Sequence, residues 1–337
     1  MSSQMLAEAM DAPEKVSGLL SRDGETYASL GARLRELDPA LVGTIARGSS
    51  DHAAGYAAYL IPQCTGRLVA SVPPSVVTVL NSKLRLKGQF VLALSQSGGS
   101  PDIIAALERA RQGGALTAAL VNQPDSKLEK AAEVFLPQHA GQEKSITATK
   151  SVLCTLTGIA RLAAEWSQDS ALGKGLKALP GSLREAAEAG SRFDDQLLKG
   201  VSHAFVLSRA LGYGAATEIA LKCKETCGVH AEAFSTAEVR HGPREIVNKD
   251  YLVIALAIPG SGEADVLQAA QELKAQGARL LVVGPKGDFP LPGTADPRLY
   301  PLVALQLLYP WIARCAVALG RDPDKPKTLS GKVIKTT

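Results

Sequence analysis

Short runs of apolar residues alternate along the chain with longer, alanine-rich segments in which apolar positions recur at helical spacing. The runs at 41–46, 90–94, 204–208 and 251–258 have the length and composition of buried strands. Strands that are buried on both faces and alternate with helices are typical of a parallel sheet that helices cover. The pattern therefore predicts an α/β fold.

This pattern occurs twice with the same internal spacing. A strand leads into a turn that begins with arginine, and the separation from Arg47 to Gly66 equals that from Arg209 to Gly228, where each helix ends. The next strand of each half runs into a Ser-Gly turn, and the following helix closes at a Gly-Ala pair. Matching features at matching separations predict an internal duplication.

The duplication sets the expected domain boundaries. We expect a helical N-terminal arm over 1–34, a first unit over 35–172, a helical linker over 173–195, a second unit over 196–321 and a tail over 322–337. A chain of 337 residues also exceeds what one hydrophobic core usually supports, which agrees with two domains.

Charge and cysteine content narrow the class of partner and the compartment. The 37 basic and 33 acidic side chains nearly cancel, and no dense run of lysine and arginine indicates binding to nucleic acid or a membrane. The five cysteines are an odd number in mostly apolar stretches, which is typical of reduced thiols. Since the N-terminus has no signal-peptide core and polar residues interrupt 299–320, we expect a cytoplasmic protein that binds a small molecule.

The turn after the second predicted strand has the composition of a phosphate site. It reads Ser-Gln-Ser-Gly-Gly-Ser over 95–100 and precedes Pro101 and a helix. The N–H groups at a helix start and the serine hydroxyls can donate to phosphate, and glycines let the backbone come close. An ordinary turn with Ser100 as helix cap is the alternative. Its place at the carboxyl end of a parallel strand, like that of Ser49 and Ser50, favours a ligand site.

Candidate acid and base groups lie in the second half. Glu218, Lys222 and Glu225 follow at steps of four and three, which places them on one face of a helix. A solvated face with ion pairs is the alternative. The next segment, 230–243, contains two histidines and two glutamates, and we interpret it as a loop suited to general acid–base chemistry.

Other chemistries find little support in the sequence. A metal site of Cys223, Cys227 and His230 matches no standard zinc spacing. The chain also contains no GxSxG nucleophile elbow, no Walker motif and no GxGxxG after a strand. We therefore expect no metal and no cofactor.

Five motifs together resemble the sugar isomerase (SIS) family, in particular the isomerase half of glutamine:fructose-6-phosphate aminotransferase and stand-alone deaminases. They are GSSDHA (48–53), SQSGGSPD (95–102), AGQEKSITATK (140–150), EIALKCKETCGVHAEAFSTAEVRHGP (218–243) and LSGKV (329–333). The resemblance covers nearly the whole chain. It implies two tandem SIS domains, each a flavodoxin-like parallel sheet flanked by helices.

The resemblance also implies residue roles. It assigns the phosphate to Ser50, Ser95, Gln96, Ser97 and Ser100, and the sugar to Ser49, Ile146 and Ala148, where Ala148 replaces a serine usual in the synthase. It implies that Glu225 moves a proton between C1 and C2 with Lys222 beside it. His241 would assist ring opening from the neighbouring subunit of a homodimer.

The family's C-terminal lysine, which forms an imine with the ketose, has an imperfect match. Counted without a gap from Leu329, its position falls on Gly331, and Lys332 takes the role only if one residue is inserted. A solvated lysine on a frayed tail is the alternative.

The start of the chain bears on the reaction. The synthase's glutaminase domain uses an N-terminal cysteine, whereas Ser2 stands here and only about 34 residues precede the first unit, so we expect no glutamine-derived nitrogen. The leading hypothesis is an isomerising deaminase that converts glucosamine 6-phosphate and water to fructose 6-phosphate and ammonia. Alternatives are a deaminase of galactosamine 6-phosphate, a deglycase of a fructosamine 6-phosphate, or a non-catalytic sugar-phosphate sensor. A sensor would not need Glu225 with His241, which favours the enzyme.

Overall fold

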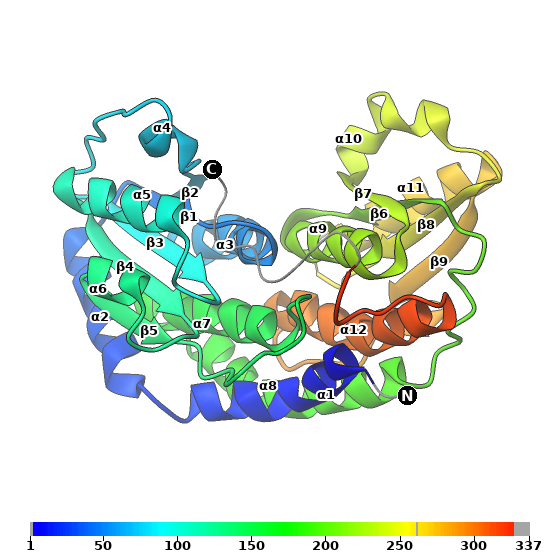
Figure 1. Ribbon diagram of the computed structural model, residues 1–337, viewed down its shortest axis with the longest axis horizontal. Helices are drawn as coiled ribbons and strands as arrows, with labels where there is room; N and C mark the ends of the chain where they lie inside the picture. The colour runs from blue at the N-terminus through cyan, green and yellow to red at the C-terminus, as the bar shows by residue number, and fades with distance from the viewer. Residues whose placement is uncertain (1–2, 261, 327–337) are drawn as a thin grey trace. The chain divides into compact units, whose positions relative to one another are not determined.

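Two parallel five-stranded sheets form the frame of the protein in a computed structural model that describes residues 3–260 and 262–326 (Figure 1). The first sheet has the order β2-β1-β3-β4-β5 and the second has the order β10-β9-β8-β6-β7. The strands are β1 (Leu41–Ile45), β2 (Leu68–Ser71), β3 (Phe90–Ser95), β4 (Leu116–Val121), β5 (Val134–Pro137), β6 (His203–Ser208), β7 (His230–Ser235), β8 (Tyr251–Leu256), β9 (Arg279–Gly284) and β10 (Phe289–Pro290).

The two sheets have the same topology. Numbered within its own half, each follows the order 2-1-3-4-5 of flavodoxin-like folds, with every neighbouring pair parallel. The predicted α/β class, with two tandem parallel sheets flanked by helices, is therefore confirmed.

Helices cover both faces of each sheet, as buried parallel sheets require. In the first half α2, α3 and α7 pack together, and α4, α5 and α6 form a second layer; in the second half α9 packs with α12, and α10 with α11. The helical segments are α1 (Gln4–Leu20), α2 (Gly24–Leu37), α3 (Ser49–Thr65), α4 (Ser75–Thr78), α5 (Pro101–Gln112), α6 (Lys127–Ala131), α7 (Lys150–Ser167), α8 (Ser170–Gly190), η1 (Ala210–Gly212), α9 (Tyr213–Lys222), η2 (Cys223–Cys227), α10 (Thr236–Arg240), η3 (Pro243–Ile246), α11 (Glu263–Ala275), η4 (Pro297–Leu299) and α12 (Tyr300–Ala318).

The chain folds into two compact units that do not follow chain order. Residues 14–142 and 150–177 form one, which holds the first sheet and is called here the first-sheet unit. Residues 3–13 and 143–149 join the described residues from 178 onward in the other, the second-sheet unit. The expected boundaries at 34, 172, 195 and 321 stay predictions.

The interpretation of 230–243 as a loop is wrong. Its first six residues form β7, the next five form α10, and η3 follows at Pro243. As an edge strand β7 pairs only with β6, and it leaves His230 and Glu232 exposed while Ala231 is buried. Polar residues on the open face of an edge strand look like a polar loop in the sequence.

Among the described residues, one helix, Pro297–Ala318, is long and apolar enough to cross a membrane by length and composition alone. Of its most apolar 18-residue window, 83% is buried inside the protein, as in a core helix.

Candidate functional site

The first sheet changes direction between β1 and β3, and both neighbouring strands lead into predicted phosphate-binding residues. β1 pairs with β3, while β2 and β4 lie on their outer sides. Ligands in open α/β sheets bind outside the carboxyl ends of strands at this switch point. Ser49 and Ser50 open α3 there, and an ion pair of 3.1 Å from Arg47 Nε to Asp102 Oδ2 joins the turn after β1 to the start of α5.

Serine hydroxyls shape the candidate phosphate turn, residues 95–100. Ser95 Oγ accepts a hydrogen bond from the N–H of Gly98 at 3.0 Å, and Ser97 Oγ accepts one from the N–H of Gly99 at 3.3 Å. Each hydroxyl keeps its own proton for donation, since it acts only as an acceptor in these bonds. Both serines can therefore hold the turn and donate to a phosphate.

Gly98 fits this turn for a steric reason. Its φ of 61° lies in the left-handed region, and a Cβ placed on it would stand 2.8 Å from Cγ1 of Val121. Ser100 occupies the N-cap position of α5 without a capping hydrogen bond to the described helix. The N-cap position itself agrees with the alternative interpretation as an ordinary turn, and the phosphate role of Ser100 stays a prediction.

A buried glutamine fixes the base of the turn. Gln138 is fully buried, and its amide donates to the carbonyl oxygens of Ser95 at 3.1 Å and Leu120 at 3.0 Å. The carbonyl of Gly98 in addition accepts the N–H of Leu128 at 3.1 Å. Hydrogen bonds from Gln138, which follows β5, and from Leu128, on α6, thus hold the turn in place.

Glu218, Lys222 and Glu225 form a buried charge cluster in the second-sheet unit. Lys222 Nζ lies 3.0 Å from Glu218 Oε1 and 3.1 Å from Glu225 Oε2, and Tyr309 OH donates to Glu218 Oε1 at 3.2 Å. The side chains of Lys222 and Glu218 are 1% exposed, and that of Glu225 is 24% exposed. The alternative of a solvated charged face is therefore wrong, and Glu225 is the member that solvent or a substrate can reach.

The carboxylates set the charge of the lysine. Burial alone would lower the pKa of Lys222, but Glu218 and Glu225 outweigh it and raise that pKa to about 12. Burial, with Glu218 next in effect, raises the pKa of Tyr309 well above its ordinary value. At neutral pH Lys222 is an ammonium and Tyr309 a phenol, so both act as donors toward the carboxylates.

Glu225 comes from a single π-helical turn, Cys223–Cys227, which follows α9 and ends at Gly228 with a φ of 67°. Such turns are frequent at functional sites because the wider turn redirects side chains. Arg321 Nε donates to the carbonyl of Thr226 at 2.8 Å, and its guanidinium covers Gly228. Arg321 thereby fastens the turn that carries Glu225.

His241 is exposed at the end of α10, a short helix that ion pairs attach to α11. Arg240 bonds Asp265 at 2.6 Å and Glu272 at 3.0 Å, and Thr236 donates to Asp265. The Thr236 bond and then Arg240 lower the pKa of Asp265, and Arg240 lowers the pKa of Glu272. Among the described residues, His241 makes no hydrogen bond or ion pair with Lys222 or Glu225.

The loop 143–149 places Ile146 and Ala148 in the second-sheet unit, together with the charge cluster. Its odd-numbered residues are buried, whereas Ile146 and Ala148 are half-buried. Glu143 accepts the N–H of Thr149 at 2.9 Å and is close enough to Tyr309 to raise its pKa further. Lys332 lies outside the described residues.

The two cysteines considered for a metal site differ from His230 in solvent exposure. Cys223 and Cys227 are buried, which raises the pKa of both thiols, that of Cys227 to about 11, whereas His230 is exposed on β7. Within residues 3–260 and 262–326, no group of three or more His, Cys, Asp or Glu side chains is arranged to hold a metal ion.

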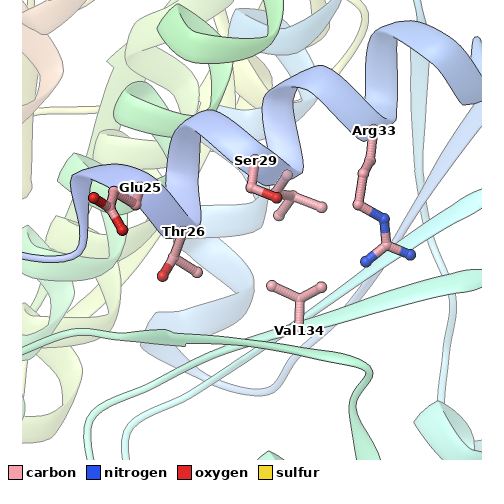
Figure 2. Close-up of a pocket in the computed structure, with 6 residues that line it drawn as sticks. Glu25, Thr26, Ser29, Arg33 and Val134 are labelled. Carbon is pink, nitrogen blue, oxygen red and sulfur yellow. The ribbon is translucent and has the colours of Figure 1, made fainter.

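A separate shallow pocket of about 310 Å³ lies between α2 and β5 (Figure 2). It is lined by Glu25, Thr26, Ser29, Leu30, Arg33 and Val134. Arg33, which Figure 2 shows beside Val134, is paired with Glu133, and none of the predicted site residues lines this pocket.

Comparisons with known proteins identify relatives of the whole chain. It is 31% identical over 364 residues to glutamine–fructose-6-phosphate aminotransferase (isomerizing) of Thermus thermophilus, covering 98% of this chain and 58% of that protein. The Streptomyces coelicolor enzyme of the same name is 29% identical over 361 residues, with the same shares covered. The chain thus spans under three fifths of the length of these relatives.

Solved structures show the same fold. A proposed phosphosugar isomerase from Silicibacter pomeroyi superposes with a TM-score of 0.89 at 34% identity, over 96% of this chain and 100% of that one. Glucosamine-6-phosphate deaminase from Thermotoga maritima superposes with a TM-score of 0.80 at 24% identity, over 99% and 100%, which shows the fold alone. The SIS domain model matches residues 42–164 and 197–304, one segment for each sheet. The chain therefore belongs to the SIS domain family, with two SIS segments, and is related to sugar-phosphate isomerases and to enzymes of amino-sugar metabolism.

Proposed function

We propose that this protein is an isomerising deaminase that converts glucosamine 6-phosphate and water to fructose 6-phosphate and ammonia. The observation that carries the proposal is the buried charge cluster, in which only Glu225 is accessible and Lys222 holds one of its oxygens at 3.1 Å. A carboxylate fixed in this way is suited to moving a proton between neighbouring carbons. The relatives and structural neighbours named above act, by their names, on sugar phosphates.

The proposed reaction needs four steps. His241 assists opening of the sugar ring, which exposes the C1 aldehyde. Glu225 removes the proton from C2, and the electron pair forms an enolamine whose developing negative charge the Lys222 ammonium stabilises. Glu225 then returns the proton to C1, while the C1 oxygen takes up a proton and the amine nitrogen gives one up, which leaves an imine at C2 and a hydroxyl at C1. Water adds to the imine carbon and ammonia leaves, which gives the ketose.

The substrate phosphate is assigned to the first-sheet unit. Ser50, Ser95, Gln96, Ser97 and Ser100 would hold it, with Ser49, Ile146 and Ala148 beside the sugar. We also propose a cytoplasmic homodimer in which His241 acts in the neighbouring subunit, and an imine-forming role for Lys332.

Incubation of the purified protein with glucosamine 6-phosphate, followed by assays of ammonia and fructose 6-phosphate, tests the proposal. Glu225→Gln is expected to lower kcat at least about 1,000-fold while substrate affinity changes little, because the amide cannot accept a proton. Glu245→Gln, at an exposed glutamate of η3 in the same unit, is the matched control and should keep full activity.

Each alternative gives a different result in the same assay. Ammonia from galactosamine 6-phosphate or a fructosamine 6-phosphate, but not from glucosamine 6-phosphate, would replace the proposed substrate. Tight binding of these sugar phosphates without any ammonia would overturn the enzyme and favour a sensor. Full turnover by the Glu225→Gln variant would remove Glu225 as the base.

A further inference from the structure

The loop 143–149, which carries Ile146 and Ala148, is held by residues far away in the chain. Glu8, on α1, is 2% exposed, and its carboxylate accepts the N–H of Lys144 at 2.5 Å and the N–H of Ser145 at 3.2 Å. Gln4 donates to the same carboxylate at 3.3 Å. A buried carboxylate is costly unless donors surround it, and here two of those donors are main-chain groups of the loop.

Asp324, just after α12, completes this attachment. Its carboxylate accepts the N–H groups of Gln4 at 2.7 Å and Met5 at 2.6 Å, the first residues of α1. A negative charge at a helix N-terminus is favourable because it faces the free N–H groups and the positive end of the helix dipole. Asp324 therefore sets the position of α1, and with it the position of Glu8.

The segment around Asp324 also contacts the loop directly. The N–H of Ile146 donates to the carbonyl of Asp324 at 3.3 Å, and Thr147 Oγ1 donates to the carbonyl of Pro323 at 2.6 Å. The loop, residues 4–8 of α1 and residues 323–324 form a closed set of hydrogen bonds within the second-sheet unit. These bonds fix the main chain of the loop, whose odd-numbered side chains are buried while Ile146 and Ala148 stay half-buried.

We propose that Glu8 and Asp324 are positioning residues for the deaminase reaction: they hold the loop 143–149 so that Ile146 and Ala148 border the sugar. The inference rests on the proposed function for its catalytic consequence, but the attachment of the loop can be tested without any substrate. In the proposed role, neither Glu8 nor Asp324 touches the reacting atoms. Both act through the main chain of the loop.

Hydrogen exchange of the substrate-free protein tests the attachment. Glu8→Gln keeps the size of the side chain but replaces one acceptor oxygen by a donor, so one loop N–H loses its partner. We expect amides in peptides covering 144–147 to exchange at least about ten times faster, while peptides covering 218–228 are unchanged. Glu14→Gln, at an exposed glutamate of the same helix, should leave exchange in the loop unchanged.

Kinetics with glucosamine 6-phosphate test the positioning role. A displacement of about 1 Å in a reacting group can cost 100-fold in rate, so Glu8→Gln should lower kcat/KM by about 10–100-fold. Its affinity for inorganic phosphate should stay within about twofold of the wild type, because the phosphate residues belong to the first-sheet unit. A variant whose second-sheet unit is misfolded would instead show faster exchange in the peptides covering 218–228 as well.

Asp324→Asn serves as a second variant if Glu8→Gln does not fold. It keeps one acceptor oxygen, and we expect smaller effects of the same kind, with faster exchange at 146–147 and in the first turn of α1. Unchanged loop exchange in both variants would overturn the attachment. A loosened loop with wild-type kcat/KM would overturn the positioning role. If the wild-type protein released no ammonia, the proposed function would fail, and the exchange result would still decide the attachment.

Discussion

Replacing Lys222 by methionine should destabilise the second-sheet unit strongly, because it removes the only positive charge inside the described charge cluster. Lys222 is 1% exposed and bonds two carboxylates at 3.0 and 3.1 Å, and one of them, Glu218, is itself 1% exposed. Methionine fills a similar volume but leaves those carboxylates without their cation. Breaking a buried ion pair from one side typically costs about 3–5 kcal/mol.

This cost should be visible as a lower melting temperature. For a domain of 150–250 residues, 1 kcal/mol shifts Tm by about 2–4 °C, so we expect a decrease of roughly 6–20 °C. The protein has two tryptophans, Trp166 in the first-sheet unit and Trp311 in the second-sheet unit. A Trp166→Phe background therefore lets the fluorescence of Trp311 report the unfolding of the unit that contains the cluster.

Two controls separate the lost ion pairs from a general effect of the substitution. Lys224→Met, at an exposed lysine in the π turn that follows Lys222, should change Tm little. Adding Glu218→Gln to Lys222→Met should recover part of the loss, because one buried charge is removed. Equal losses in Lys222→Met and Lys224→Met, or no recovery in the double variant, would refute the reasoning.

The pH dependence follows from the raised pKa of Lys222. A group whose pKa is higher in the folded state stabilises the fold below its unfolded pKa, near 10.5, and loses that contribution as the pH rises through about 12. The difference in stability between wild type and Lys222→Met should therefore stay constant from pH 7 to pH 9. A difference that disappears within this range would mean that Lys222 is not held as an ammonium.

Two further variants test the local geometry of each unit. Gly98→Ala should weaken the binding of inorganic phosphate at least about tenfold, as measured by calorimetry. The new Cβ would lie 2.8 Å from Val121 Cγ1, and a left-handed backbone costs a non-glycine residue about 1 kcal/mol. Gly88→Ala, at a φ of 75° with nothing within 4 Å of a Cβ, is its control, and equal phosphate affinity in both would contradict the steric argument. Arg321→Met should lower the deaminase kcat about tenfold or more, because the carbonyl of Thr226 in the π turn loses its donor. An unchanged kcat would show that Arg321 does not hold the π turn in its active position.

The sequence predicted those parts of the fold that are buried on both faces. β3 and β4 are buried at every position, so they appear as continuous apolar runs whose interpretation depends little on their surroundings. β2 and β7 are edge strands, and their exposed residues follow from their place in the sheet. That place depends on the whole topology, which no local pattern contains.

The site was predictable to the extent that it is local. The spacing of Lys222 and Glu225 put them within reach of each other, and their contact confirms it. Whether that face is buried or solvated depends on its packing against α12, whose Tyr309 donates to Glu218 and lies in a mostly apolar segment of the sequence. The hydroxyl of Tyr309 needs a hydrogen-bond partner if that segment is buried, and this is the signal that could have indicated a buried charged group beside it.

The π turn and the supports of the 143–149 loop were not predictable. A single wide turn changes the helical period too briefly for a periodic pattern to show it. Glu8 and Asp324 are ordinary surface-type residues in the sequence, and only the fold makes them acceptors of main-chain N–H groups, Glu8 buried and Asp324 half-buried. The roles assigned to Ser49, Ile146, Ala148 and Lys332 stay predictions.

The bonds from Asp324 to the first turn of α1 also determine when the protein can finish folding during synthesis. The acceptor lies about 320 residues after its donors, which at roughly 5–20 residues per second is on the order of a quarter of a minute to a minute of translation. During that interval the first turn of α1 has left the ribosome without the carboxylate of Asp324 that caps it. The carboxylate of Glu8 also has no bond to the N–H groups of residues 144 and 145 until these have been translated. The first-sheet unit, whose residues are complete once 177 has emerged, can fold first. Nascent chains should therefore protect the first sheet long before the first turn of α1, because that turn is capped only after residue 324 has been translated.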